Sequence, residues 1–128
     1  SIMLVANQLS DTLSVINSNI AEVSPSTIAT GEVPTQIAFT RDGTRAFVTN
    51  QFSDTVSVID ITRHTQLFTI PVGNTPTGIK LNRSNRFAVV TNAGDDTISI
   101  IDTRVNQVTA TVPVGDAPQH LVILEAGL

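Results

Sequence analysis

The chain has 128 residues, of which 41% are hydrophobic and 14% are charged, a composition typical of one folded domain rather than of a disordered segment. A formal net charge of −4 and a lack of clustered lysine and arginine predict no nucleic-acid partner, because clustered cations supply the affinity for phosphate backbones. The absence of cysteine excludes disulfides, thiolate nucleophiles and cysteine-ligated metals, and no apolar run reaches the roughly 18 residues of a membrane-spanning helix.

One segment occurs three times along the chain, at residues 5–17, 48–60 and 90–102. A Gly-x-x-Pro motif follows each copy, with its glycine at 31, 73 or 115. The period of about 42 residues lies in the range of solenoids, propellers and other repeat arrays. Valine, isoleucine, leucine and threonine must build most of the core, since tryptophan and tyrosine are absent, and this set favours strands over helices.

The middle repeat shows how its strands follow one another. Residues 36–40 predict a first strand and residues 46–50 a second, with a tight turn between them. The alternating apolar and polar residues 56–60 predict a third strand, and residues 66–72 predict a fourth. Four strands per repeat form a small antiparallel sheet, which is the unit of a β-propeller blade.

Proline positions agree with this assignment. Proline cannot donate a hydrogen bond to a ladder, so it belongs in loops or on edge strands. One recurring set, predicted in the loops between repeats, is Pro34, Pro76 and Pro118. A second recurring set falls in the fourth, outer strand: Pro25, Pro71 and Pro113.

We therefore predict an all-β fold, a β-propeller of four-stranded antiparallel blades with three blades in this chain. The sequence begins at the second strand of a blade, residues 2–6, and ends with a first strand at residues 120–124. The predicted units are blade 1 at residues 1–31 completed by strand 119–125, blade 2 at residues 32–73, and blade 3 at residues 74–115.

Three phrases carry a resemblance to a known family. They are Val-Thr-Asn at 48–50 and 90–92, the Asp-Thr-(Val/Ile)-Ser-(Val/Ile)-Ile-Asp that follows, and the closing Pro-Val-Gly at 71–73 and 113–115. The chain thereby resembles the YVTN-type β-propeller repeats of archaeal and bacterial surface-layer and other secreted proteins. Phe47, Val89 and Leu4 replace the signature tyrosine. The resemblance implies an extracytoplasmic or cell-surface location, and the sequence itself shows no signal peptide.

Three blades are fewer than the usual four to eight of a closed ring, and they leave two apolar blade faces uncovered. We therefore predict a homodimer that forms a six-bladed ring with C2 symmetry, in which the C-terminal strand completes a split blade. A trimer of nine blades and an excised or engineered propeller fragment are the alternatives.

Polar side chains that recur once in each blade are interpreted as structural. An aspartate just before the third strand is expected to accept a backbone N–H two residues further on, and one at the end of that strand to do so before the next turn. Asparagines at the end of the second strand are expected to satisfy backbone groups. These positions are Asp11, Asp54 and Asp96, then Asp60 and Asp102 with Asn17 in their place in blade 1, and finally Asn7, Asn50 and Asn92.

Function is expected where the copies differ. We call the end of the blades that carries the inter-blade loops and the loops between second and third strands the loop face, and the opposite end the turn face. The loop face is predicted to be acidic and to hold the ligand-binding residues Glu32, Gln36, Asn74, Asp95, Asp116 and His120, with Lys80 in the innermost strand. Six arginines fall on or near the turn face: Arg41, Arg45, Arg63, Arg83, Arg86 and Arg104.

The favoured function is a non-catalytic binding or scaffold propeller that presents the acidic loop face to a protein, a glycan or a small ligand. No catalytic residue and no cofactor is predicted, because the common nucleophile, phosphate-loop and zinc motifs are missing. The alternative is a metal-dependent lyase or lactonase-like enzyme, with a divalent cation on the acidic loop face held by His120, Asp116 and neighbouring acids of two chains. A propeller fragment would bind no ligand.

Overall fold

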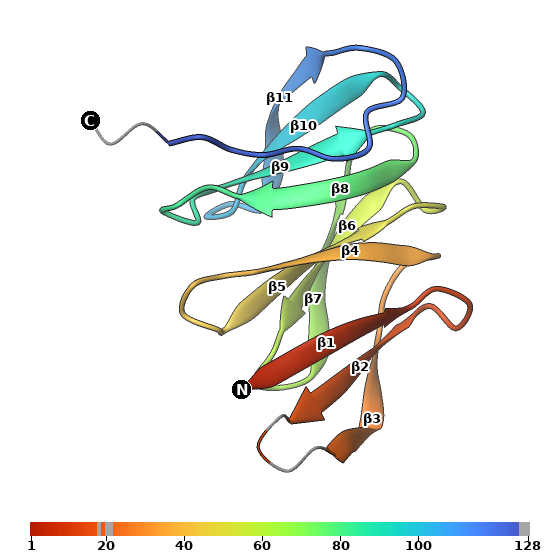
Figure 1. The fold of residues 1–128 in the computed structure, drawn as a ribbon, viewed down its shortest axis with the longest axis vertical. Helices are drawn as coiled ribbons and strands as arrows, with labels where there is room; N and C mark the ends of the chain where they lie inside the picture. Colours follow the sequence, from red (N-terminus) through yellow and green to blue (C-terminus); the bar gives the residue numbers. More distant parts are fainter. Residues whose placement is uncertain (18, 20–21, 126–128) are drawn as a thin grey trace.

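The computed structural model describes residues 1–17, 19 and 22–125, and these form three antiparallel sheets that lie side by side as blades (Figure 1). Within these residues, blade 1 has the strand order β1-β2-β3, while blades 2 and 3 comprise β4 to β7 and β8 to β11. The strands are β1 (Ile2–Asn7), β2 (Thr12–Asn17), β3 (Glu22–Ala29), β4 (Pro34–Phe39), β5 (Arg45–Asn50), β6 (Thr55–Asp60), β7 (Thr65–Pro71), β8 (Pro76–Leu81), β9 (Phe87–Asn92), β10 (Thr97–Asp102) and β11 (Gln107–Pro113). Among the described residues, no helix is long and apolar enough to cross a membrane.

The all-β fold and the antiparallel blades predicted from the repeats are confirmed. β5 pairs with β6 from Arg45↔Asp60 to Asn50↔Thr55, and β9 pairs with β10 in the equivalent register. One detail differs from the prediction, because Pro34 and Pro76 open β4 and β8 instead of lying in the preceding loops. The first position of a strand accepts proline, since it needs no donor to the ladder.

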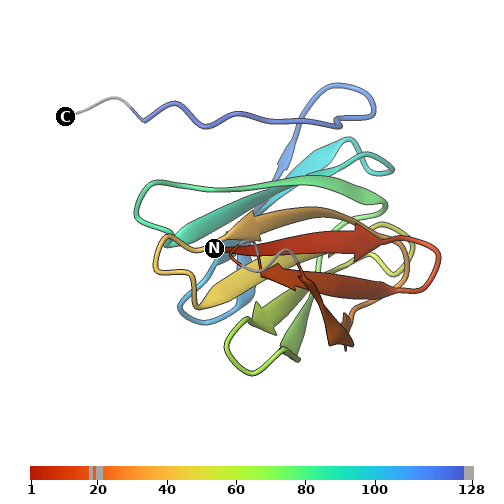
Figure 2. The same ribbon diagram turned by 60° about the horizontal axis from the view of Figure 1, so that its bottom comes forward.

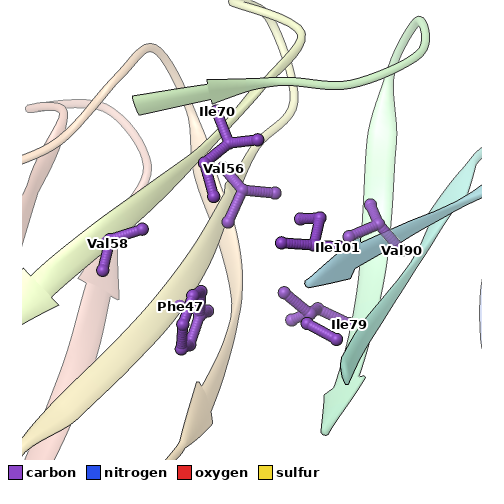
Figure 3. Packing of buried hydrophobic residues seen from close by; sticks show 8 residues of the cluster. Phe47, Val56, Val58, Ile70, Ile79, Val90 and Ile101 are labelled. Carbon is purple, nitrogen blue, oxygen red and sulfur yellow. The ribbon is translucent and has the colours of Figure 1, made fainter. Parts of the chain in front are cut away.

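Side chains from alternate strand positions fill the space between blades. Phe47 of β5 belongs to the cluster shared with blade 3, while Ala46 and Val48 belong to the cluster shared with blade 1. Successive side chains of a strand leave opposite faces of the sheet, so one strand serves both junctions. Figure 3 shows the junction of blades 2 and 3, which comprises Phe47, Val56, Val58, Ile70, Ile79, Ala88, Val90 and Ile101. The junction of blades 1 and 2 comprises Leu13, Val15, Ile28, Ala46, Val48, Ile59 and Ile61.

The outer faces of blades 1 and 3 remain uncovered in the described part of a single chain. On blade 1, Met3 and Val5 are exposed, although they hold the strand positions of the buried Ala46 and Val48. On blade 3, Val112 is exposed at the position that Ile70 holds in blade 2. Each end of the row of blades therefore presents an apolar face of the kind that is buried between blades.

The segment after β11 lies beside blade 3 and away from β1 (Figures 1 and 2). Thr77 Oγ1 donates to the carbonyl of Pro118 at 3.2 Å, and the N–H of Arg83 donates to the carboxylate of Glu125 at 2.6 Å. The segment therefore follows β8 in the same direction, without forming a ladder within the described single chain. Its predicted pairing with blade 1 stays a prediction.

A glycine makes this close approach feasible. A Cβ atom at position 78 would lie 2.5 Å from the carbonyl oxygen of Gln119, closer than real Cβ contacts come. Gly78 therefore lets residues 118–119 lie directly against β8, where β4 carries Gln36 at the corresponding position.

Candidate functional site

Each aspartate ahead of a third strand fastens the next inter-blade loop. The carboxylate of Asp54 accepts the backbone N–H of Thr75 at 2.9 Å. Equivalent bonds run from Val33 to Asp11 at 2.9 Å and from Ala117 to Asp96 at 2.8 Å. The expectation of a donor two residues further on is corrected, because the donor lies 21 or 22 residues away, in the loop after the outermost strand of the blade. All three aspartates have φ of 56–57°, a left-handed conformation that aspartate tolerates.

The recurring asparagines join neighbouring strands through their side chains. The amide nitrogen of Asn50 donates to Thr55 Oγ1 at 3.0 Å and to Ser57 Oγ at 2.8 Å. The equivalent bonds are Asn7 to Thr12 and Ser14, and Asn92 to Thr97 and Ser99. The partners are thus hydroxyls of the next strand rather than the expected backbone groups. A Cβ atom at Gly31 would lie 2.8 Å from the Asn50 amide, which explains the glycine of the Gly-x-x-Pro motif.

The acids at the ends of the third strands hold the turns that follow, as expected. Asp60 accepts the N–H of Arg63 at 3.1 Å, and Asp102 accepts that of Arg104 at 2.9 Å. In blade 1, Asn17 Oδ1 accepts the N–H of Asn19 at 3.0 Å. Asp102 has a further role, because its buried carboxylate also lies 3.9 Å from a guanidinium nitrogen of Arg86.

Two of the predicted ligand-binding residues meet at one hollow on the loop face. Glu32 and Asn74 line it together with Phe52 and Thr75, and its volume is about 570 Å³. The Phe52 ring is 68% exposed and stands in a loop that differs in every repeat. Phe52 was not among the predicted ligand-binding residues, although an apolar ring in a variable polar loop was a signal in the sequence.

The other predicted residues do not line this hollow. The carboxylate of Asp95 is engaged with the backbone N–H of Asn74 at 2.7 Å. Lys80 is exposed and lines a separate hollow between the innermost strands β4 and β8. Asp116 and His120 are exposed on the segment after β11, and Gln36 is half-buried in β4. Within the described residues, no group of three or more histidine, aspartate or glutamate side chains could hold a metal ion.

A second charged hollow opens on the turn face. It is lined by five arginines, namely Arg41, Arg45, Arg83, Arg86 and Arg104. The sequence predicts these arginines on the turn face, but not that they meet at one hollow. The absence of nucleic acid stays a prediction, but its stated ground, a lack of clustered cations, is corrected at this point of the surface.

Comparison with known proteins identifies the family of the repeats. A family model described as a YNCE-like beta-propeller matches residues 1–86, which is more than half of the chain. No curated protein matches the sequence.

Solved structures share the arrangement of the blades. A hydrazine synthase from Kuenenia stuttgartiensis superposes with a TM-score of 0.89 at 28% identity, covering 94% of this chain and 35% of that one. A functionally unknown protein from Desulfotomaculum acetoxidans gives 0.81 at 17% identity, with 90% and 37% covered. Apo AztD from Citrobacter koseri gives 0.72 at 13% identity, with 86% and 32% covered. The chain thus spans about a third of the length of each, and the two lower identities show the fold alone.

Proposed function

This chain belongs to the YNCE-like β-propeller family, and from that premise we propose that it is a non-catalytic binding and scaffold propeller that receives a ligand on its loop face. The supporting observation is how the polar side chains of that face are used. The repeated aspartates Asp11, Asp54 and Asp96 all accept backbone N–H groups of the following loop. The side chains of Glu32 and Asn74 make no hydrogen bond within the described residues, and they share a hollow with exposed Phe52.

The composition of this hollow favours a cationic ligand with an apolar flank. Glu32 and Asp54 contribute negative charge, and no lysine or arginine lines the hollow. The exposed ring of Phe52 offers a face for a cation–π contact beside these carboxylates. A basic segment of a protein partner, or an amino sugar of a glycan, has both properties. We also propose an extracytoplasmic or cell-surface location, for which the resemblance to YVTN-type repeats is the support.

Calorimetric titration with a short lysine- and arginine-rich peptide, and separately with a chitosan oligomer, tests the binding role. We expect Phe52→Ala and Glu32→Gln each to weaken binding about fivefold, because a cation–π contact and an exposed ion pair are each worth up to about 1 kcal/mol. Phe68→Ala and Glu22→Gln are matched controls, because both side chains are exposed on outer strands away from the hollow. The proposal fails if neither probe binds at millimolar concentration, or if the controls weaken binding equally.

For the scaffold role we propose that two copies close a six-bladed ring. Residues 118–125 run beside β8, as the innermost strand of a following blade would. Repeating the β4–β5 and β8–β9 registers would pair Leu121 with Val5 of the partner subunit and Ile123 with Met3 of the partner subunit. This pairing would bring the uncovered face of blade 3 against the uncovered face of blade 1. Both exposed apolar faces would then be buried, as at the junctions within the chain.

Size-exclusion chromatography with light scattering tests the ring. We expect twice the chain mass of 13.6 kDa at micromolar concentration. Val5→Lys places a charge in the proposed junction and should give a monomer, whereas Leu9→Lys, at a fully exposed site on the loop face, should leave the dimer intact. A monomeric or trimeric unmodified protein would contradict the six-bladed ring.

A further inference from the structure

The arginine-lined hollow on the turn face lies where two blades meet. Its volume is about 720 Å³, within the range of small-molecule sites. Residues 40–42 and 45 of blade 2 form one side, and residues 83–86 and 103–104 of blade 3 form the other. β4 and β8 end on the same side of the molecule, which brings the turns that follow them together (Figure 1).

Three of these arginines stand where the other repeats have no cation. Arg45 corresponds to Phe87 in blade 3 and Ile2 in blade 1. Arg86 corresponds to Thr44, and Arg104 corresponds to Thr62. A blade therefore folds without arginine at these positions, so blade architecture does not account for their convergence on one hollow.

Contacts with neighbouring groups restrain two of these arginines, Arg45 and Arg86. A guanidinium nitrogen of Arg45 donates to the carbonyl of Thr103 at 3.2 Å. The guanidinium carbon of Arg45 lies 5.5 Å from the centre of the Phe47 ring. This bond uses one of the five N–H donors of a guanidinium. Arg86 lies over the Phe87 ring at 5.1 Å.

The hollow keeps a surplus of positive charge. Asp102 pairs with Arg86 and Arg104, and Glu125 pairs with Arg83. Asp42 is the remaining acid, and its carboxylate accepts the hydroxyls of Thr40 and Thr44 and the N–H of Thr44. Five guanidinium groups thus face three carboxylates, a formal surplus of two charges. The side chain of Arg41 makes no hydrogen bond or ion pair within the described residues.

We propose that this hollow is a binding site for a small oxyanion ligand that carries at least two phosphate or carboxylate groups. Guanidinium groups bind both planar and tetrahedral oxyanions through paired N–H donors, and several can act on one ligand. A small ligand remains within the surplus of positive charge. A long polyanion would extend onto a protein whose net charge is −4, beyond the Debye length of about 10 Å over which the arginines act.

Calorimetric titration of the full chain with inorganic pyrophosphate and with citrate, at constant ionic strength, tests the site and separates the phosphate class from the carboxylate class. We expect at least one of the two to bind. Arg41→Gln and Arg45→Gln should each weaken that binding about tenfold, as expected for the loss of a charge-assisted hydrogen bond. Arg63→Gln is the matched control, because Arg63 is an exposed turn-face arginine outside the hollow.

Arg41→Gln keeps the test interpretable, because in the described part of the chain this side chain has no partner whose loss would disturb the fold. Circular dichroism should show unchanged unfolding of this variant. Absence of binding by both anions at millimolar concentration would overturn the proposal, as would an equal loss in Arg63→Gln. Binding of a single-stranded oligonucleotide that is far tighter than either anion, and that Arg41→Gln abolishes, would also overturn it by assigning the hollow to a polymer.

Discussion

The hollow on the loop face is lined by acids without lysine or arginine, the hollow on the turn face is lined by five arginines, and the two faces use their charges differently. On the loop face, Asp11, Asp54 and Asp96 recur in every blade, and each accepts a backbone N–H of the following loop. On the turn face, Arg45 and Arg104 occur once and converge on a hollow between two blades. A charge that is repeated in every blade therefore has a structural role, and a charge that is not repeated is the better candidate for a ligand-binding residue.

Two phenylalanines give the largest contrast between repeated and unrepeated positions. Phe47 is fully buried at a position that is apolar in each repeat, so Phe47→Ala should lower the free energy of unfolding by about 3–5 kcal/mol. Phe52 is exposed in a variable loop, so Phe52→Ala should change the free energy of unfolding by less than about 0.5 kcal/mol. Urea denaturation measures both values. Similar losses in the two variants would break the comparison.

Two acids of the loop face, Asp54 and Glu32, should differ in the same way, with smaller losses of unfolding free energy. Asp54→Ala removes the acceptor of the Thr75 N–H and places alanine at φ 56°, so we expect a loss of about 2 kcal/mol in unfolding free energy. Asp54→Asn keeps an acceptor oxygen and should lose less. Glu32→Ala changes an acid that Asn74 replaces in blade 3 and whose side chain makes no hydrogen bond in the described residues, so its effect should be within about 0.5 kcal/mol. Denaturation curves in which Glu32→Ala is the most damaging of the three would contradict this assignment.

The smallest expected effect concerns Asp42 of the turn face. Hydrogen bonds from the Thr40 side chain and from the backbone and side chain of Thr44 lower the pKa of Asp42 from 3.8 to about 2. The folded state therefore binds this proton less readily than the unfolded state. The resulting stabilisation is present above pH 4 and is lost as the pH falls through about 2. Carboxyl NMR titration should give a midpoint near 2, and Asp42→Asn should flatten the acid dependence of unfolding. A midpoint near 4 would show that the turn does not hold this carboxylate.

Most of the fold could be predicted because the same strand pattern occurs in all three repeats. Alternation in residues 56–60 indicates a strand, and its copy at 98–102 predicts the same register, as β6 and β10 show. Local turn contacts such as Asp102 with the N–H of Arg104 were equally accessible, because they span few residues. The partner of Asp54 was not, since Thr75 lies 21 residues away and only the stacking of blades brings it close.

The same limitation applied to the arginine hollow. Arg45 donates to the carbonyl of Thr103, which lies 58 residues further along the sequence, so no local sequence pattern predicts their contact. The order of strands and turns in the sequence is enough to assign the arginines to one face. The convergence of Arg45, Arg86 and Arg104 on one hollow could not be predicted, because it depends on how blade 2 and blade 3 pack.

Backbone amide NMR during titration with inorganic pyrophosphate tests most directly whether ligand recognition resides where the repeats differ, at the arginine-lined hollow. The account predicts shift changes confined to residues 40–45, 83–86 and 103–104, with the recurring Asp11, Asp54 and Asp96 unaffected. Changes centred on those recurring aspartates, or spread evenly over the three blades, would contradict it.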